Sequence, residues 1–572
     1  MTHNVDSSNS TSDAGHFKSP SFSSPITRFK QWVEDTPERV FLRQPQGNQW
    51  QEYSFQTVWD KAECLAQYLK RLPPRSHVAI YSLNCAEWFI VDLAILMAGH
   101  VSVPIYPTAG RSTIDFILQH GDIKLAFVGK LFDWEDKKVC FASYETLSFF
   151  NEKPHLKFWE EEIKRLTPLE QTYQAQANEL ATIVYTSGTT GSPKGVMLSY
   201  RAISSALLTV EQVFEINQQD RLFSYLPLAH VAERMIVEMA AVYFGAQVSF
   251  VESLDRFTNN LNSVKPTVFF GVPRIWVKLK QGVENKLGGA KLCRLLFSLP
   301  GVGNWLKKKI INGLGLADVK IALSAAASLP KGVIDWFEGL EVEICEAYGL
   351  SETAGFSHIN LPGHRKAGTV GRPFPGAECM LAENGEVLLR NGSLMDGYYK
   401  LQELSSAVIQ DGWFRTGDLG EIDSEGYLSI TGRVKEIFKT LKGKYISPVP
   451  IENQLLPKLD VEHLCVTGAN LPHPILIVSW LQPWTPENKS KMSKQIEAVL
   501  SQVNANLEKH ERINLVLMVN EDWTTDNGMM TPTLKIRRQA IDKHYADIVE
   551  KYPSSKIMKV QWCERAKTDN AE

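Results

Sequence analysis

Short apolar runs alternate with amphipathic stretches from about Pro25 to Ile430, and this alternation restricts the folds open to the chain. The apolar runs predict buried strands, and the stretches between them have the spacing of helices with one apolar face. Strands that alternate with helices favour parallel sheets covered by helices on both faces. Strands are predicted at Val78–Leu83, Leu125–Val128, Thr182–Tyr185, Gln247–Val251, Thr267–Phe270 and Lys320–Ser324. Helices are predicted at Phe55–Lys70, Glu87–Ala98, Ile114–His120 and Arg201–Phe214.

The pattern changes near Gly371 to short strands separated by turns, such as Glu386–Arg390 and Tyr427–Thr431. A chain of 572 residues is also longer than one hydrophobic core usually serves. We therefore predict an α/β chain in three parts. Residues 1–24, rich in Ser and Thr, form a disordered segment; residues 25–433 form a large domain of parallel sheets covered by helices, with a small β-rich subdomain; residues 434–572 form a small α+β domain.

Composition excludes several classes of protein. The formal net charge of −3 gives no support for nucleic-acid binding. The eight cysteines form no Cys-x-x-Cys pair, which argues against a zinc knuckle or a disulfide framework and favours reduced thiols in the cytoplasm. The N-terminus does not have the pattern of a secretory signal, and no apolar run is long enough to span a bilayer. We expect a cytoplasmic protein, with peripheral contact at the inner membrane face left open.

Residues 185–195 read Tyr-Thr-Ser-Gly-Thr-Thr-Gly-Ser-Pro-Lys-Gly and directly follow a predicted buried strand. Hydroxyl side chains, glycines that let backbone N–H groups approach an anion, and the charge of Lys194 together predict a loop that holds phosphate. The order of residues differs from that of the common nucleotide P-loop. The alternative is a surface turn rich in Ser, Thr and Gly.

Residues 346–353 read Glu-Ala-Tyr-Gly-Leu-Ser-Glu-Thr and combine groups suited to a nucleotide. Tyr348 could stack on a purine, Gly349 allows close backbone approach and Ser351 can donate to a phosphate. Glu352 can hold a Mg²⁺ ion that neutralises phosphate charge. A serine-hydrolase elbow is excluded because Thr353 occupies the place of its second glycine.

These two motifs, followed by three more in the same order, resemble those of adenylate-forming enzymes, which include acyl-CoA synthetases, luciferases and peptide-synthetase adenylation domains. The three further motifs are Gly-Trp-Phe-Arg-Thr-Gly-Asp at 412–418, Thr-Gly-Arg-Val-Lys-Glu-Ile-Phe-Lys at 431–439 and Thr-Pro-Thr-Leu-Lys-Ile-Arg-Arg at 531–538. Taken alone, the Thr-Gly-Asp is more often a simple turn and Lys535 a surface lysine. The resemblance extends from about residue 28 to 545.

The resemblance implies roles for individual residues. It assigns ATP or AMP binding to Thr186, Ser187, Gly188, Thr189, Thr190, Gly191, Lys194, Tyr348, Gly349, Ser351, Asp418 and Arg433. It assigns catalysis to Lys535, Glu352 and Thr186, with Glu352 also the metal ligand. Lys435 would be the hinge of a mobile C-terminal domain, and Gly443 and Lys444 would belong to the CoA loop.

Finer features are similar to the long-chain fatty acyl-CoA synthetase branch. They are Val103–Ala109, Leu226–Arg234, Gly271–Trp276 and the segment 436–448. Within them His230 is expected to line the acyl site, although a histidine in an apolar stretch is also often a satisfied core residue. The resemblance implies activation of a long-chain fatty acid with ATP and Mg²⁺, and transfer to CoA. The alternatives are a fatty acyl-AMP ligase that loads an acyl carrier protein, a luciferase-like oxygenase, and a non-catalytic binder of acyl groups or nucleotide.

The sequence does not decide the effect of two departures from the family pattern or the role of one surface segment. Ala325-Ala326-Ala327 stands where the family usually has glycine beside the adenine, and Leu441-Lys442 replaces a Ser-containing loop near the CoA channel. The extra methyls could crowd the purine or merely fill space. Lys278–Leu316 is predicted to be helical and basic, with Lys307-Lys308-Lys309 beside Trp305, Ile310 and Ile311. It is either a membrane-surface or lid helix, or an ordinary solvated face.

Overall fold

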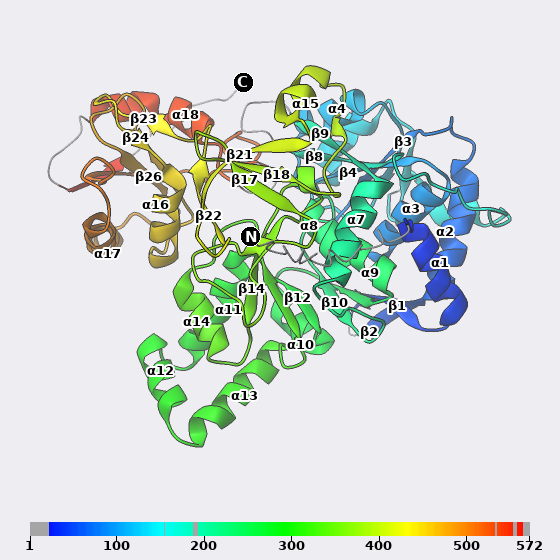
Figure 1. The fold of residues 1–572 in the computed structure, drawn as a ribbon, viewed down its shortest axis with the longest axis horizontal. Helices are drawn as coiled ribbons and strands as arrows, with labels where there is room; N and C mark the ends of the chain where they lie inside the picture. Colours follow the sequence, from blue (N-terminus) through cyan, green and yellow to red (C-terminus); the bar gives the residue numbers. More distant parts are fainter. Residues whose placement is uncertain are drawn as a thin grey trace, which may run out of the picture.

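The computed structural model describes residues 22–47, 49–153, 155–186, 193–531, 535–552 and 558–563. Two large sheets form the main body, and a smaller sheet and a C-terminal unit lie against it (Figure 1). The predicted fold class is confirmed: large sheets with helices precede a small β-rich part and an α+β unit. The bounds predicted at residues 24/25 and 433/434 stay predictions. Ser24 is already ordered, because its side chain accepts the Thr27 N–H at 3.2 Å and begins the first helix.

The first large sheet has eight strands, and the predicted phosphate loop connects two strands near one edge of it. Its order is β19 (Gly397–Tyr398), β9 (Lys194–Ser199), β8 (Leu180–Thr186), β4 (Val101–Ile105), β3 (His77–Tyr81), β5 (Ile123–Val128), β6 (Thr146–Ser148) and β7 (Lys157–Phe158). The strands from β8 to β7 are parallel, whereas β8–β9 and β9–β19 are antiparallel. The predicted phosphate loop therefore joins two antiparallel strands.

The second large sheet has nine strands and is parallel in its centre. Its order is β16 (Arg372–Pro373), β15 (His358–Ile359), β14 (Ile344–Tyr348), β13 (Ile321–Ser324), β12 (Val268–Phe270), β10 (Arg221–Ser224), β11 (Gln247–Phe250), β1 (Val40–Gln46) and β2 (Gln49–Ser54). Antiparallel pairs occur at both ends, at β1–β2 and from β14 to β16. The parallel sheets of the prediction thus have antiparallel pairs near their edges.

The predicted helices are present with bounds that differ by a few residues. They are α2 (Phe55–Leu69), α3 (Ala86–Met97), α4 (Arg111–His120) and α7 (Tyr200–Glu211). Further helices are α1 (Pro25–Asp35), α5 (Trp134–Lys137), α6 (Trp159–Ile163), α8 (Val231–Glu233), α9 (Ala240–Phe244), α10 (Phe257–Val264), α11 (Pro273–Lys286), α12 (Ala290–Ser298), α13 (Val302–Leu314) and α14 (Lys331–Glu338). None of the described helices is both long and apolar enough to cross a membrane.

Helix α3 is buried along its whole length, because it lies between the two large sheets and contacts β3, β4 and β1. It carries Asp92, whose two carboxylate oxygens each accept a hydrogen bond at 2.7 Å from the Arg234 guanidinium. Ser102 on β4 donates a further hydrogen bond to the same carboxylate. Arg234 begins a π-helical turn, Arg234–Met239, and Glu238 of that turn lies 4.0 Å from its guanidinium. One arginine therefore faces two buried carboxyl groups.

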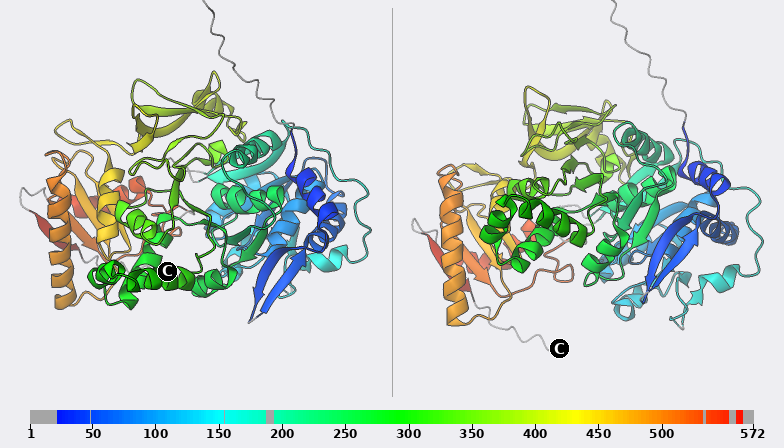
Figure 2. Two further views of the ribbon diagram at one scale, coloured as in Figure 1. Left: turned by 60° about the horizontal axis from the view of Figure 1, so that its bottom comes forward. Right: turned by 90° about the horizontal axis from the view of Figure 1, so that it is seen from below.

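The β-rich subdomain and the C-terminal unit follow in sequence. The subdomain contains β17 (Glu378–Leu381), β18 (Glu386–Arg390), α15 (Gln402–Val408), β20 (Ile409–Gln410), β21 (Trp413–Ile422) and β22 (Leu428–Arg433). The C-terminal unit contains β23 (Phe438–Lys439), β24 (Tyr445–Ile446), α16 (Pro448–Leu455), β25 (His463–Thr467), β26 (Ile475–Ser479), α17 (Pro486–Ala505), β27 (Leu515–Val519), α18 (Arg538–Lys551) and β28 (Lys559–Cys563). Figure 2 shows α17 at the opposite end of the molecule from α1 and α2.

Alternate residues of the C-terminal sheet enter two separate hydrophobic clusters. On β26, Leu476 and Val478 pack with residues of α16 and α17, whereas Ile475 and Ile477 pack with residues of α18. All four side chains are buried, since helices cover both faces of the sheet. The unit therefore has its own core, separate from that of the large sheets.

The Asp92–Arg234 pair predicts an asymmetric stability effect. We expect Arg234→Met to cost about 3–5 kcal/mol, because it leaves Asp92 and Glu238 buried without a cation. Asp92→Asn should cost less, since Arg234 still faces Glu238. Calorimetric unfolding checks both variants. The control is Arg390→Met, because Arg390 also donates to both carboxylate oxygens of its partner, Glu378, but at the exposed surface. The control should lose about 1 kcal/mol or less. Equal losses for Arg234→Met and Asp92→Asn would contradict this account.

Candidate active site

The site lies where strand ends of both large sheets meet the β-rich subdomain and a loop of the C-terminal unit. Thr186, the last residue of β8, pairs with Lys194, the first residue of β9. The two residues therefore hold the ends of the predicted phosphate loop together. Ser187, Gly188, Thr189, Thr190 and Gly191 lie outside the described residues.

Tyr398, which the sequence motifs did not indicate, contacts both Lys194 and Glu352. The Lys194 ammonium lies 5.2 Å from the centre of the Tyr398 ring. The Tyr398 hydroxyl donates to Glu352 Oε1 at 2.7 Å, and the Glu352 carbonyl accepts the Met395 N–H at 2.8 Å. Burial, followed by the charge of nearby Lys435, lowers the pKa of Lys194 below its ordinary value. Tyr398 lies on the short edge strand β19, where its sequence has no distinctive pattern.

Glu352 fits the metal-binding role predicted for it. Its Oε1 is oriented by Tyr398, and no described residue donates a hydrogen bond to its Oε2. The described residues contain no group of three or more His, Cys, Asp or Glu side chains able to hold a metal ion alone. Mg²⁺ commonly binds through one or two carboxylates together with substrate phosphates. This single, oriented carboxylate suits an ion that arrives with a nucleotide.

Asp418 is oriented by two partners from neighbouring strands. The Tyr348 hydroxyl, at the end of β14, donates to Asp418 Oδ2 at 2.6 Å, and Arg433 Nε donates to Oδ1 at 2.8 Å. Asp418 and Arg433 stand opposite each other in the β21–β22 pair. Burial and the Asp418 charge raise the pKa of Tyr348, which keeps its hydroxyl protonated as a donor. Each Asp418 oxygen keeps a second acceptor position, which suits the two hydroxyls of a ribose.

Gly349 is required by close backbone packing. A Cβ atom at this position would collide with the Gly355 carbonyl. The chain turns here from β14 into a 3-10 turn, Ser351–Thr353, and the Leu350 N–H is capped by the Thr353 hydroxyl at 3.1 Å. This turn presents Ser351 and Glu352 next to the end of β14.

Lys535 is brought to the large domain by the C-terminal unit. Its segment is closed on itself, because the Lys535 N–H donates to Thr531 Oγ1 at 3.1 Å and its carbonyl accepts the Thr531 N–H at 2.8 Å. Enclosure by the surrounding protein, and then the charge of Arg433, lower the pKa of Lys535, while Asp418 opposes this shift. Lys535 is nevertheless exposed to solvent. Arg433 and Asp418 therefore lie within electrostatic range of Lys535.

His230 is neutral and lies within electrostatic range of Lys535. Its Nδ1 accepts the Ala232 N–H at 3.1 Å at the start of α8, so the ring proton of the neutral form lies on Nε2. Burial, followed by the charge of Lys535, lowers the pKa of His230 to about 4. The ring also meets Tyr106 edge-on, at 6.3 Å between centres. His230 thus combines a structural role at α8 with one hydrogen-bond donor left over.

A buried network that the sequence analysis did not single out supports the His230 segment. Glu233 Oε1 accepts hydrogen bonds from the Ser224 hydroxyl at 2.9 Å and from the Tyr225 N–H at 3.0 Å. Asn84, just before α3, donates to the Leu226 carbonyl at 2.6 Å. Burial raises the pKa of Glu233 to about 8. The only sequence signal was that Glu233 lies in the motif that contains His230.

The predicted hinge residue lies near the nucleotide site, whereas the predicted CoA loop is an exposed hairpin tip. Lys435 lies two residues after the end of β22, within electrostatic range of Lys194. Gly443 and Lys444 form the exposed tip of the β23–β24 hairpin. The Gly443 N–H donates to the Thr440 carbonyl at 2.9 Å, and the Lys444 N–H donates to Thr440 Oγ1 at 3.2 Å. These bonds close the hairpin itself.

Ala326 adopts a backbone conformation that favours glycine. Its φ is +74°, and both Ala326 and Ala327 are exposed. A residue with a Cβ in this region carries strain of about 1–2 kcal/mol. The two methyl groups therefore fill no packed space in the protein.

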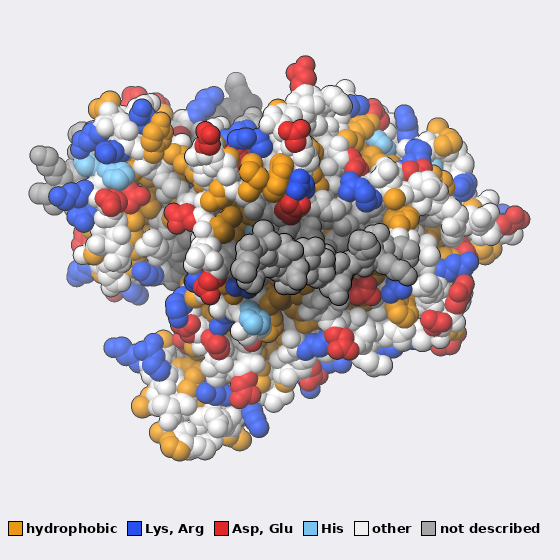
Figure 3. Space-filling model, viewed as in Figure 1, with side chains coloured by type: hydrophobic (Ala, Val, Ile, Leu, Met, Phe, Trp, Pro, Cys, Tyr) orange, Lys and Arg blue, Asp and Glu red, His pale blue; other side chains and the backbone are white. Residues whose placement is uncertain are grey.

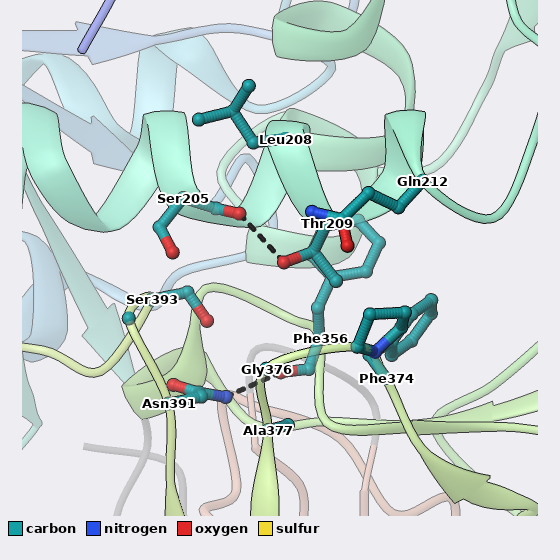
Figure 4. Close-up of a pocket in the computed structure, with 12 residues that line it drawn as sticks. Ser205, Leu208, Thr209, Gln212, Phe356, Phe374, Gly376, Ala377, Asn391 and Ser393 are labelled. Atoms are coloured by element: carbon teal, nitrogen blue, oxygen red, sulfur yellow. Dashed lines mark hydrogen bonds between the residues drawn. The ribbon is translucent and has the colours of Figure 1, made fainter. Parts of the chain in front are cut away.

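A separate cavity of about 160 Å³ lies between α7 and the segment 391–393 (Figure 4). Its wall includes Phe356, whose carbonyl accepts the Asn391 side-chain N–H at 3.1 Å. Ser393 donates to the Thr353 carbonyl at 3.1 Å, so the cavity lies behind the turn that carries Glu352. None of the predicted site residues lines it.

Comparison with known proteins identifies the family. Residues 29–399 match the AMP-binding enzyme family, and residues 436–555 match the AMP-binding enzyme C-terminal domain. The chain belongs to the AMP-binding enzyme family. It is 30% identical to long-chain-fatty-acid–CoA ligase FadD15 of Mycobacterium bovis, over 83% of this chain and 87% of that protein. It is 29% identical to long chain acyl-CoA synthetase 2 of Arabidopsis thaliana, over 82% of each.

A solved structure shares the fold at lower identity. The anthranilate CoA ligase AuaEII, in complex with anthranoyl-AMP, matches with a TM-score of 0.74 at 20% identity, over 93% of this chain and 99% of that chain. The relatives place this AMP-binding enzyme among the adenylate-forming acyl-CoA ligases.

Two substitutions distinguish the structural role of His230 from a contact with substrate. His230→Asn keeps an acceptor for the Ala232 N–H but loses the donor at Nε2, whereas His230→Gln keeps a donor near Nε2 but loses the cap. If Nε2–H contacts the substrate, His230→Gln retains about tenfold more ATP–pyrophosphate exchange than His230→Asn, an amount typical of one hydrogen bond. The opposite order would leave His230 with the capping role alone.

The same experiment has a pH dependence with a defined sign. The folded protein resists protonation of His230 down to about pH 4, whereas an ordinary histidine takes up its proton near 6.5. The pH profile of ATP–pyrophosphate exchange by the wild type should therefore have no inflection near pH 6.5 that is due to His230. The profile of His230→Gln should have the same shape in that region.

Proposed function

We propose that this AMP-binding enzyme activates a long-chain fatty acid with ATP and transfers the acyl group to CoA. The observation that carries the proposal is the position of Lys535. A cation from the C-terminal unit lies within electrostatic range of Arg433 and Asp418 of the large domain and of His230. A positive charge between a nucleotide site and an acyl site suits a reaction that joins two anions.

In the first step, a carboxylate oxygen attacks the α-phosphorus of ATP. The new O–P bond forms as the bond to the β-phosphate oxygen breaks, which gives an acyl-adenylate and pyrophosphate. Lys535 would lie between the carboxylate and the α-phosphate and reduce their repulsion. Thr186, Lys194 and the loop between them would hold the outer phosphates, and Asp418 the ribose. Positioning and electrostatics supply most of the rate enhancement in such transfers.

Glu352 is the residue we assign to Mg²⁺. The ion, held by its free carboxylate oxygen and by phosphates, would neutralise phosphate charge. Tyr398 would orient this carboxylate through its hydrogen bond to Oε1.

In the second step, the CoA thiolate attacks the acyl carbon, the bond to AMP breaks, and AMP leaves. We propose that the C-terminal unit swings about Lys435, so that Lys535 leaves and the Gly443–Lys444 hairpin approaches. The exposed position of that hairpin is consistent with a role in the other arrangement. An acyl carrier protein is the alternative thiol, and supplying each acceptor to preformed acyl-adenylate distinguishes them.

Lys535→Ala should separate the two steps. Adenylation, measured by ATP–pyrophosphate exchange, is expected to fall about 10²–10³-fold, as for loss of one charged contact in a transition state. Thioester formation from preformed acyl-adenylate and CoA should keep most of its rate. Lys543→Ala on α18, an exposed lysine of the same unit, is the matched control and should change neither step. Equal losses in both steps would overturn the role given to Lys535.

Chain length is tested with a panel of acids. The curated relatives named above are long-chain enzymes, whereas the structure with the same fold contains an adenylated aromatic acid. Each buried CH₂ contributes about 0.8 kcal/mol, so a long apolar site favours palmitate over octanoate, and octanoate over butyrate, by orders of magnitude in kcat/KM. CoA-dependent AMP release with butyrate, octanoate, palmitate and coumarate measures this. A preference for coumarate or butyrate would reject the long-chain proposal and leave the adenylation chemistry unaffected.

A further inference from the structure

Helices α12 and α13 form a hairpin that projects from the main body. It lies at the bottom of Figure 1, away from the eight-stranded sheet and from the C-terminal unit. One side of the hairpin is anchored. Cys293 is buried, Phe297 meets Trp336 at 6.1 Å between ring centres, and Ile310 and Ile311 pack against the cluster around α11 and α14.

The other side of the hairpin exposes large apolar side chains. They are Leu292, Leu295, Leu299, Val302 and Trp305, and between 41% and 61% of each is exposed. They make up five of the 17 exposed large hydrophobic residues in the described parts of the chain. On α12, Leu292 and Leu295 are three residues apart, which places them on one face of the helix, and Leu299 directly follows the helix. Ile310 and Ile311, which lie beside the lysines in sequence, turn inward and form the packed side of α13.

The hairpin is also strongly cationic. Residues 285–317 contain no Asp or Glu and carry six cations, which are Lys286, Lys291, Arg294, Lys307, Lys308 and Lys309. The segment has a charge of +6, whereas the whole chain has −3, so the remainder carries −9. Lys309 lies over the Trp305 ring at 5.0 Å, which brings a cation and an exposed aromatic together. Figure 3 shows hydrophobic side chains at the tip of this projection and Lys or Arg groups around it.

We propose that the α12–α13 hairpin docks the protein on an anionic lipid bilayer. Exposed Leu and Trp side chains would enter the region between headgroups and acyl chains, and the lysines would contact the negative headgroups. The charge contrast favours this partner over a second copy of the chain, because two hairpins, each with five cations and no Asp or Glu in residues 290–314, would repel each other. The negative charge of the remaining surface would orient the molecule, with the hairpin toward the membrane.

Sedimentation with vesicles tests the charged part of the proposal. The intact protein should sediment with phosphatidylcholine vesicles that contain 30% phosphatidylglycerol, and far less with phosphatidylcholine alone. Lys308→Gln/Lys309→Gln should weaken binding about 30-fold, since each lysine near an anionic surface contributes about fivefold. The control is Lys491→Gln/Lys494→Gln, which removes two exposed lysines of α17 in the C-terminal unit. Equal weakening by both pairs would indicate non-specific charge attraction and overturn the proposal.

A second pair of variants tests the apolar part. Leu295→Ser/Trp305→Ser should reduce sedimentation at least tenfold, whereas Phe132→Ser/Leu254→Ser, which alters side chains 88% and 73% exposed elsewhere, should not. Unchanged thermal unfolding confirms that each variant is folded. Absence of wild-type binding, or a wild-type dimer that the hairpin variants abolish, would overturn the proposal. No acid, ATP or CoA is present, so this result is independent of the substrate tests.

Discussion

A charge pair buried between the two large sheets positions much of the rest of the structure. Helix α3 lies between these sheets, so a carboxylate on it is tolerated only with a partner. Asp92 finds that partner in Arg234, whose guanidinium donates to both of its carboxylate oxygens. Arg234 follows His230 by four residues, and its N–H donates to the His230 carbonyl at 3.0 Å. The buried pair therefore also anchors the segment that presents His230.

The other half of the site has an excess of positive charge. The pKa values of Lys194 and Lys535 are lowered by burial first, and then by the charges of Lys435 and Arg433 respectively. Asp418 offsets part of this charge. On the proposed function, a triphosphate supplies the missing negative charge and favours the arrangement with Lys535 in place. Departure of pyrophosphate would remove that charge, and repulsion among the cations would then favour movement of the C-terminal unit.

The α12–α13 hairpin differs from the rest of the surface in both charge and polarity. Sequence composition indicated that the segment is basic and helical, and the structure has three helices over Lys278–Leu316. Which apolar residues face outward depended on how the hairpin packs. Phe297, Ile310 and Ile311 face the body, and the residues at and near the tip are left exposed. Helical periodicity alone has no reference direction until one face has a neighbour.

The sequence by itself determined the fold class, the positions of the main strands and helices, and the motifs of the site. It could do so because apolar periodicity and turn residues act locally, and because motifs such as Thr-Pro-Thr-Leu-Lys are read along the chain. Only the tertiary structure decided that β8 and β9 run antiparallel, that α3 is buried on every side, and that Tyr398 holds Glu352. It also brought Lys535 within electrostatic range of Asp418, more than a hundred residues away in sequence. These features depend on side chains brought together from distant segments, and no local pattern encodes such a meeting.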